Sequence, residues 1–160
     1  MSQRQQGKFY QCQREAVYEE PSRCLSCNVL RYEPGRAVLS VLKELETIAP
    51  VVAVQGNVEA DEVIRKLPIQ REIVVGHGRI GVLHILGDSH NRERIARQEF
   101  PNAQCVVFGH SHIPWNQEYT GLLLFNPGSA TDRRRQSRCS IGLLHLDDEA
   151  KDVRGEIVWL

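Results

Sequence analysis

The feature that most restricts the fold is the stretch VVFGHSH at 106–112, where a buried-strand pattern ends in a glycine followed by two histidines one residue apart. Side chains alternate in direction along a strand, but a loop at the carboxyl end of a strand can turn both imidazoles toward one point. Because imidazole is a common metal ligand, this stretch predicts a strand with a metal site at its end.

From Pro34 onward the chain alternates between helical and strand periodicity, with turn signals between the segments. The helical pattern predicts helices over 37–48, 61–66 and 91–99. Apolar runs predict strands over 51–54, 72–75, 79–86 and 104–108, a hairpin over 116–125, and C-terminal strands over 139–146 and 155–160. Alternating helices and strands indicate the α/β class, with antiparallel pairing among the consecutive C-terminal strands.

Residues 1–33 differ from the remainder, since they are rich in Gln, Arg, Glu and Cys and have no sustained period or clean strand pattern. We therefore divide the chain into an atypical N-terminal segment, 1–33, and a domain, 34–160. Cys24 and Cys27 could form half of a zinc site, with Cys12 as a third ligand. A structural zinc site needs four ligands and no second Cys-x-x-Cys pair occurs, so a chance pairing is the favoured interpretation.

Composition excludes several classes of protein. A chain of 160 residues, of which 41% are hydrophobic, fits one globular domain. Its 20 basic residues balance 20 acidic ones, so no overall field attracts nucleic acid or an anionic membrane. No apolar run approaches the roughly 20 residues of a membrane span, no signal-peptide pattern opens the chain, and the cysteines do not form a secreted disulfide pattern. We expect a cytoplasmic protein.

Four polar residues lie at or near the carboxyl ends of predicted strands: Asn57, His84, His110 and His112. Imidazole nitrogens and an amide oxygen suit divalent ions such as Mn, Zn, Ni or Fe, and α/β folds assemble sites from separate strand ends. A single histidine is more simply explained as a hydrogen-bonded structural residue. Gly-Asn after one strand together with Gly-His-Ser-His after another favours a metal site.

The turn Asn126-Pro127-Gly128-Ser129 offers backbone N–H groups and a hydroxyl that could face an anion. Gly128 and Ser129 are therefore candidate contacts to a substrate phosphate, although a plain turn explains the sequence equally well. Arg133–Arg135 with Arg138 could attract a phosphorylated substrate. No aromatic residues interleave to stack bases, which favours a solvated loop and argues against a nucleic-acid partner.

Several segments in order resemble the calcineurin-like metallophosphoesterases: APVVAVQGNVEAD, RIGVLHILGD, FPNAQCVVFGHSHIPW, GLLLFNPGSATDRRR, SIGLLHLDDE and EIVWL. Within that family they are similar to small bacterial and archaeal phosphodiesterases related to the retromer subunit Vps29. The resemblance implies a sandwich of two β-sheets flanked by helices. It also implies a small phosphoester substrate and a site in which two divalent ions activate water and hold phosphate oxygens.

Carried over by position, the resemblance assigns Asn57, His84 and His110 as ligands of one metal and His112 as a ligand of the other. It also makes Asn57 and His110 the candidate catalytic residues. Val58 stands where many family members have a histidine that assists the leaving group. A valine cannot transfer a proton, and the absence of this histidine is usual in the small branch.

The chain departs from the family pattern at its N-terminus. No Asp-x-His or Gly-Asp motif precedes residue 36, although the second motif supplies the aspartate that bridges the two metals in the family. His84-Ile85-Leu86 also replaces the common His-Gly-His. Three explanations stay open: residues 1–33 are not ancestral sequence, the protein is a non-catalytic scaffold, or Asp88 or Glu33 replaces the lost carboxylate. We expect a phosphodiesterase impaired by the missing ligands, with an inactive Vps29-like scaffold for protein partners as the alternative.

Overall fold

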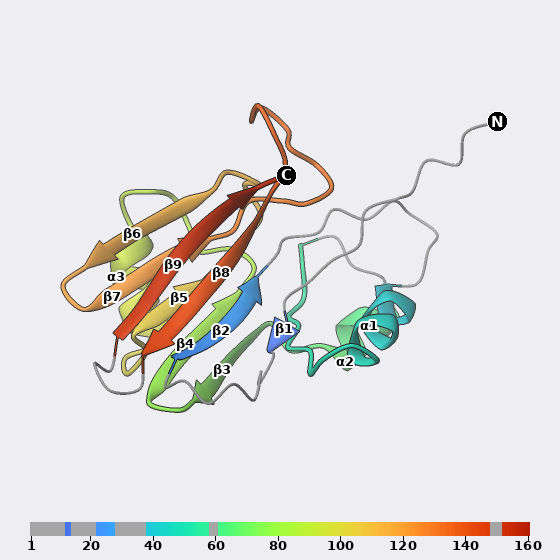
Figure 1. Ribbon diagram of the computed structural model, residues 1–160, viewed down its shortest axis with the longest axis horizontal. Coiled ribbons are helices and arrows are strands. Elements are labelled where there is room, and N and C mark those ends of the chain that lie inside the picture. The colour runs from blue at the N-terminus through green and yellow to red at the C-terminus, as the bar shows by residue number, and fades with distance from the viewer. Residues whose placement is uncertain (1–11, 14–21, 28–37, 58–60, 148–151) are drawn as a thin grey trace.

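Two β-sheets lie face to face in the computed structural model, which describes residues 12–13, 22–27, 38–57, 61–147 and 152–160 (Figure 1). The first sheet has the order β1-β2-β8-β9 and is antiparallel throughout, with strands β1 (Cys12–Gln13), β2 (Ser22–Cys27), β8 (Ser140–Asp147) and β9 (Asp152–Trp159). The second is mixed and has the order β3-β4-β5-β7-β6, with strands β3 (Gln70–Val75), β4 (Gly78–Leu83), β5 (Cys105–Val107), β6 (Trp115–Tyr119) and β7 (Leu122–Asn126). This arrangement confirms the predicted α/β sandwich.

The main core lies between the two sheets. Alternate residues of β8 are buried, as expected for a strand with one covered face, and Leu144 and Leu146 meet the inner face of the second sheet. That face contributes Val75, Ile80, Val82, Cys105, Val107, Leu123 and Phe125. The sheets approach so closely that a Cβ added at Gly142 would lie 2.4 Å from the Phe125 ring. Glycine at position 142 therefore permits this packing.

Helix α3 (Arg92–Glu99) covers the outer face of the second sheet. Ala96 and Phe100 pack there with Val106, Leu122 and Leu124, so all five residues of β7 are buried. Helices α1 (Val38–Glu46) and α2 (Asp61–Lys66) lie beside the second sheet, near the start of β3 (Figure 1). In the described part of the chain, no helix has the length and apolar character needed to cross a membrane.

Parallel pairing determines where polar side chains collect. Strand β4 pairs parallel with β5, and β5 pairs parallel with β7, so the carboxyl ends of all three lie at one edge. The Gly109 N–H donates to the His84 carbonyl oxygen (3.0 Å), and the Asn126 Nδ2–H donates to the Gly109 carbonyl oxygen (3.0 Å). These bonds hold the segments after β4 and β5 and the end of β7 together.

The helices and most strands match their predicted ranges, with two differences. The apolar run 51–54 forms a single β-bridge at Val51 rather than a strand. Its apolar character reflects burial without regular pairing, because Val52 is buried and Val54 packs on the core while Gln55 bonds to the loop at Pro68. The segment 1–33, which has no strand pattern in its sequence, nevertheless supplies β1 and β2. Strand β2 forms because the backbone of β8 provides a row of hydrogen-bond partners, which does not depend on the side-chain periodicity of β2. The side chains of Cys12, Cys24 and Cys27 lie outside the described part.

Candidate metal and phosphate site

Three of the predicted residues meet at the edge where the parallel strands end. The Asn57 Oδ1 atom lies 3.0 Å from His84 Nε2 and 3.2 Å from His110 Nδ1. The two imidazole rings are 5.3 Å apart and nearly perpendicular. Because an amide oxygen only accepts, each ring nitrogen donates its hydrogen to Asn57. We call Asn57, His84 and His110 the amide–imidazole group.

The amide–imidazole group fits a divalent cation. Two ligands at right angles, each about 2.1 Å from one ion, lie about 3.0 Å apart, and the Asn57–His84 and Asn57–His110 separations of 3.0 and 3.2 Å agree with that spacing. No group of three His, Cys, Asp or Glu side chains in the described residues could hold an ion, so a site on His84 and His110 would need the Asn57 amide as its third donor. The chemistry fits one ion on three neutral ligands, without a bridging carboxylate among the described residues.

The charge state of His84 suits a metal ligand. Desolvation by burial, and then the neighbouring His110, His112 and Arg134, lower the pKa of His84 from 6.5 to about 4. The imidazole is therefore neutral at pH 7, as a ligand must be. The same contributions place His112 and Arg134 close enough to His84 to act on its charge.

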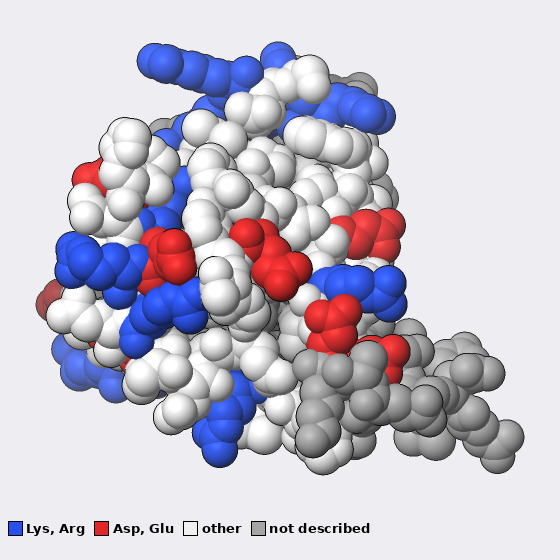
Figure 2. Space-filling model, turned by 90° about the vertical axis from the view of Figure 1, so that its left-hand side faces the viewer, with Lys and Arg blue, Asp and Glu red and all other residues white. Residues whose placement is uncertain are grey.

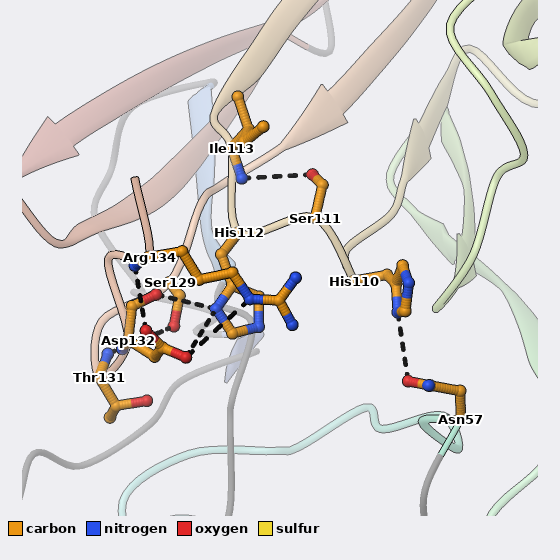
Figure 3. A network of polar contacts seen from close by, with 9 residues as sticks. All are labelled: Asn57, His110, Ser111, His112, Ile113, Ser129, Thr131, Asp132 and Arg134. Atoms are coloured by element: carbon orange, nitrogen blue, oxygen red, sulfur yellow. Dashed lines mark hydrogen bonds and ion pairs between the residues drawn. The ribbon is translucent and has the colours of Figure 1, made fainter. Parts of the chain in front are cut away.

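His112 lies in a second network and not against Asn57. Its ring is 4% exposed, and Nδ1 donates to the Asp132 carbonyl oxygen (2.8 Å) with the Asp132 carboxylate at 3.6 Å. Figure 3 shows the ring turned toward the 129–134 loop, while His110 points to Asn57. Donation from Nδ1 leaves Nε2 unprotonated in the neutral ring. We call His112, Asp132 and Arg134 the Asp132 network.

The left-handed backbone separates the two histidines. His110 has a φ of 67° and His112 a φ of 59°, values that cost a non-glycine residue roughly 1–2 kcal/mol each. The loop between them is held by Asn126, whose Nδ2 donates to the Gly109 carbonyl and to Ser111 Oγ (3.2 Å). The buried Asn126 side chain thus stabilises a conformation that directs the two rings to different partners.

Asp132 is the residue that sequence reasoning missed. Its signal was its place in the quoted stretch FNPGSATDRRR, three residues after Ser129, but nothing local indicates a partner in the 110–112 loop. In the structure Ser129 Oγ accepts from the Asp132 N–H (3.1 Å) and the Gly128 N–H donates to Asn126 Oδ1 (3.0 Å). These groups hold the loop that carries Asp132, and direct contact of Gly128 and Ser129 with a phosphate stays a prediction.

Asp88 does not take the place of the lost carboxylate. Its Oδ1 atom accepts from the backbone N–H groups of His90 (3.1 Å) and Asn91 (3.2 Å), and both its oxygens accept from the Asn91 side chain. The bond from Asn91 lowers the Asp88 pKa. Asp88 therefore supports the start of α3, and the other proposed replacement, Glu33, lies outside the described residues, as does Val58.

An arginine joins the two ends of the histidine loop. The Arg92 guanidinium carbon lies 4.9 Å from the Phe108 ring centroid and 4.8 Å from that of Trp115, residues that flank the loop. In the described part, Arg92 Nε and Trp115 Nε1 are buried without a hydrogen-bond partner, so stacking rather than hydrogen bonding forms this contact. Arg92 thereby fixes the loop ends to α3.

Comparisons with known proteins show the family of this chain. Residues 35–149 match the Calcineurin-like phosphoesterase superfamily domain. The chain is 33% identical over 117 residues to a probable metallophosphoesterase of Methanothermobacter thermautotrophicus, over 71% of this chain and 66% of that relative. The match thus spans slightly less than two thirds of the relative's length.

Two solved structures share the fold. A Thermotoga maritima protein, TM1076, is 27% identical with a TM-score of 0.57, over 76% of this chain and 74% of that one. The zinc complex of Vps29 from Entamoeba histolytica is 25% identical with a TM-score of 0.57, over 75% of each chain. These similarities extend the family relation from sequence to architecture.

Proposed function

The chain belongs to the calcineurin-like phosphoesterase superfamily, and from that membership we propose that it hydrolyses phosphodiesters with a divalent cation held by the amide–imidazole group. The observation that carries the proposal is the convergence of Asn57 Oδ1, His84 Nε2 and His110 Nδ1 at separations suited to one ion. Family membership supports the use of a divalent metal. Zinc, manganese, nickel and iron all suit two imidazoles and an amide oxygen.

The protein's own residues have distinct roles in this proposal. Asn57 and His110 hold the cation, and His84 completes the set as a neutral ligand because burial keeps its pKa low. A bound divalent ion activates water and offsets negative charge on the phosphate. His112, fixed by the Asp132 carbonyl, is the candidate ligand for a second ion, and Gly128 and Ser129 are candidate phosphate contacts.

The first experiment is hydrolysis of bis-p-nitrophenyl phosphate with Mn²⁺, Zn²⁺, Ni²⁺ or Fe²⁺, against an EDTA control. The matched variant is Asn57→Leu, which has a similar volume and no ligand atom. We expect metal-dependent turnover by the wild type and at least about a 100-fold loss in the variant. A folded wild type that is inactive with every ion would contradict the proposal.

A second candidate function is a scaffold for protein partners. It is favoured by one observation: no carboxylate joins the amide–imidazole group in the described part of the chain, and a dication on neutral ligands keeps its full charge. The structural neighbour Vps29 supports this alternative. A folded wild type that binds metal without hydrolysing phosphoesters is the expected result for a scaffold.

A further inference from the structure

Four arginines lie on the loop that leads from Ser129 to β8, but they differ in their contacts. Figure 2 shows basic side chains gathered at the top of the molecule, where this loop lies. The Arg133 guanidinium donates to the carbonyl oxygens of Gln136 (2.9 Å) and Ser137 (3.4 Å), so it stabilises the loop itself. Arg135 and Arg138 are exposed and have no partner among the described residues. Arg134 differs from all three.

Asp132 holds Arg134 at both its backbone and its side chain. The Arg134 N–H donates to Asp132 Oδ1 (3.0 Å), and Arg134 Nε lies 4.0 Å from Asp132 Oδ2. Arg134 has a φ of 45°, in the left-handed region that non-glycine residues seldom adopt. The surrounding loop therefore specifies a conformation that an unconstrained arginine would avoid.

The Arg134 side chain is directed to the candidate metal site. In Figure 3 it leaves the 129–134 loop and extends toward the side of the view where His110 and Asn57 lie. The side chain is 45% exposed, so a dissolved anion can reach it.

Resting on the proposed phosphoesterase function, we propose that Arg134 binds the non-bridging oxygens of the substrate phosphate and is the anion-recognising residue of this site. A guanidinium presents two parallel N–H groups that match two phosphate oxygens. Asp132 orients it without a close ion pair, since the 4.0 Å separation leaves the charge only partly compensated. Arg134 is thus a specificity residue that the other arginines of the loop cannot replace.

The test measures binding of inorganic phosphate by calorimetry in the presence of Mn²⁺, which does not depend on turnover. Arg134→Gln removes the charge, and Arg135→Gln is the matched control one residue away. A hydrogen bond to a charged group corresponds to roughly a 10- to 100-fold change in affinity. We expect phosphate binding to weaken by about that factor in Arg134→Gln and by less than about twofold in Arg135→Gln. Unchanged melting temperatures would show that both variants are folded.

Three outcomes would overturn the proposal: equal weakening in both variants, as expected for a solvated basic patch; no change in Arg134→Gln; or no phosphate binding by the wild type. If phosphate binding depends on Arg134 while the wild type does not hydrolyse bis-p-nitrophenyl phosphate, Arg134 is an anion-binding residue and the proposed hydrolysis fails. The two proposals are therefore separable. If hydrolysis occurs, Arg134→Gln should raise KM more than it lowers kcat, because binding of the ground state is what it loses.

Discussion

The amide–imidazole group and the Asp132 network are connected by the 110–112 loop, which gives one histidine to each, but they differ in their chemistry. Asn57, His84 and His110 meet through neutral atoms alone, so their favourable ligand is a cation that displaces the ring hydrogens. His112 instead contacts a carboxylate that is already shared with Arg134. Two histidines separated by one residue can thus serve different ligands when the backbone between them turns.

The largest expected effect is on metal affinity, which should depend on the amide–imidazole group more than on the Asp132 network. His110→Ala removes one of three ligands, and we expect binding of Mn²⁺ or Zn²⁺ by calorimetry to weaken at least about 100-fold. His145→Ala is the control, because His145 lies on β8, where it contacts Glu156 (2.9 Å) away from the site. We expect a smaller loss in His112→Ala. An equal loss in His112→Ala and His110→Ala would contradict the division into two groups.

An intermediate effect is expected from the Asp132 network. Asp132→Ala removes the carboxylate that lies near His112 and orients Arg134, and loss of such a supporting residue usually reduces activity about 10- to 100-fold. We expect kcat/KM for bis-p-nitrophenyl phosphate to fall in that range while the affinity for the first metal ion changes little. Asp152→Ala on β9 is the control, since its carboxylate contacts only the exposed Arg154 among the described residues. If Asp132→Ala lost as much metal affinity as His110→Ala, the two groups would have to be regarded as a single metal site.

The smallest expected effect is a pH dependence of the free energy of unfolding that comes from His84 alone. The unfolded chain protonates His84 near pH 6.5, whereas the folded protein holds it neutral down to about pH 4. Between these values the unfolded state binds more protons, so the free energy of unfolding should decrease as the pH falls through this window and level off below it. Because His84 is only partly buried, we expect a loss of about 1–2 kcal/mol rather than the full linkage value.

Thermal unfolding of the metal-free protein from pH 7 to pH 4 would measure this effect. The matched variant is His84→Asn, which removes the titrating group and should flatten the pH dependence. An identical slope in wild type and variant would show that other groups determine the stability in this range.

The residues of the amide–imidazole group could be predicted because each follows a recognisable apolar segment at the same edge of the fold. The strand ends that precede His84 and His110 are local features, and parallel pairing brings such ends together. The place of His112 could not be predicted, since it depends on the left-handed conformations of His110 and His112 and on a loop about 20 residues further along. Asp132 was missed for the same reason, and Arg134 was named only as one of four arginines of its loop, because long-range contacts and not local patterns direct both side chains.

The errors in predicting strands from the sequence have a similar origin. The run at 51–54 has the apolar composition of a strand, but regular pairing needs a neighbour that composition does not reveal. Strand β2 shows the converse, because its backbone pairs with Gly142–Asp147 of β8 along its whole length, from Ser22 to Cys27, without a strand-like sequence pattern. Hydrophobic periodicity therefore predicted what is buried better than what is hydrogen-bonded.

The left-handed conformations of His110 and His112 place backbone strain at two residues of the candidate site. Glycine adopts such φ values without strain, so replacing either histidine by glycine would relieve roughly 1–2 kcal/mol of backbone strain. Glycine at position 112 would also remove a ring that is 4% exposed and its hydrogen bond to the Asp132 carbonyl oxygen, and glycine at position 110 would remove the contact with Asn57 Oδ1. The contacts of the two side chains therefore offset part of the strain in the loop that carries them.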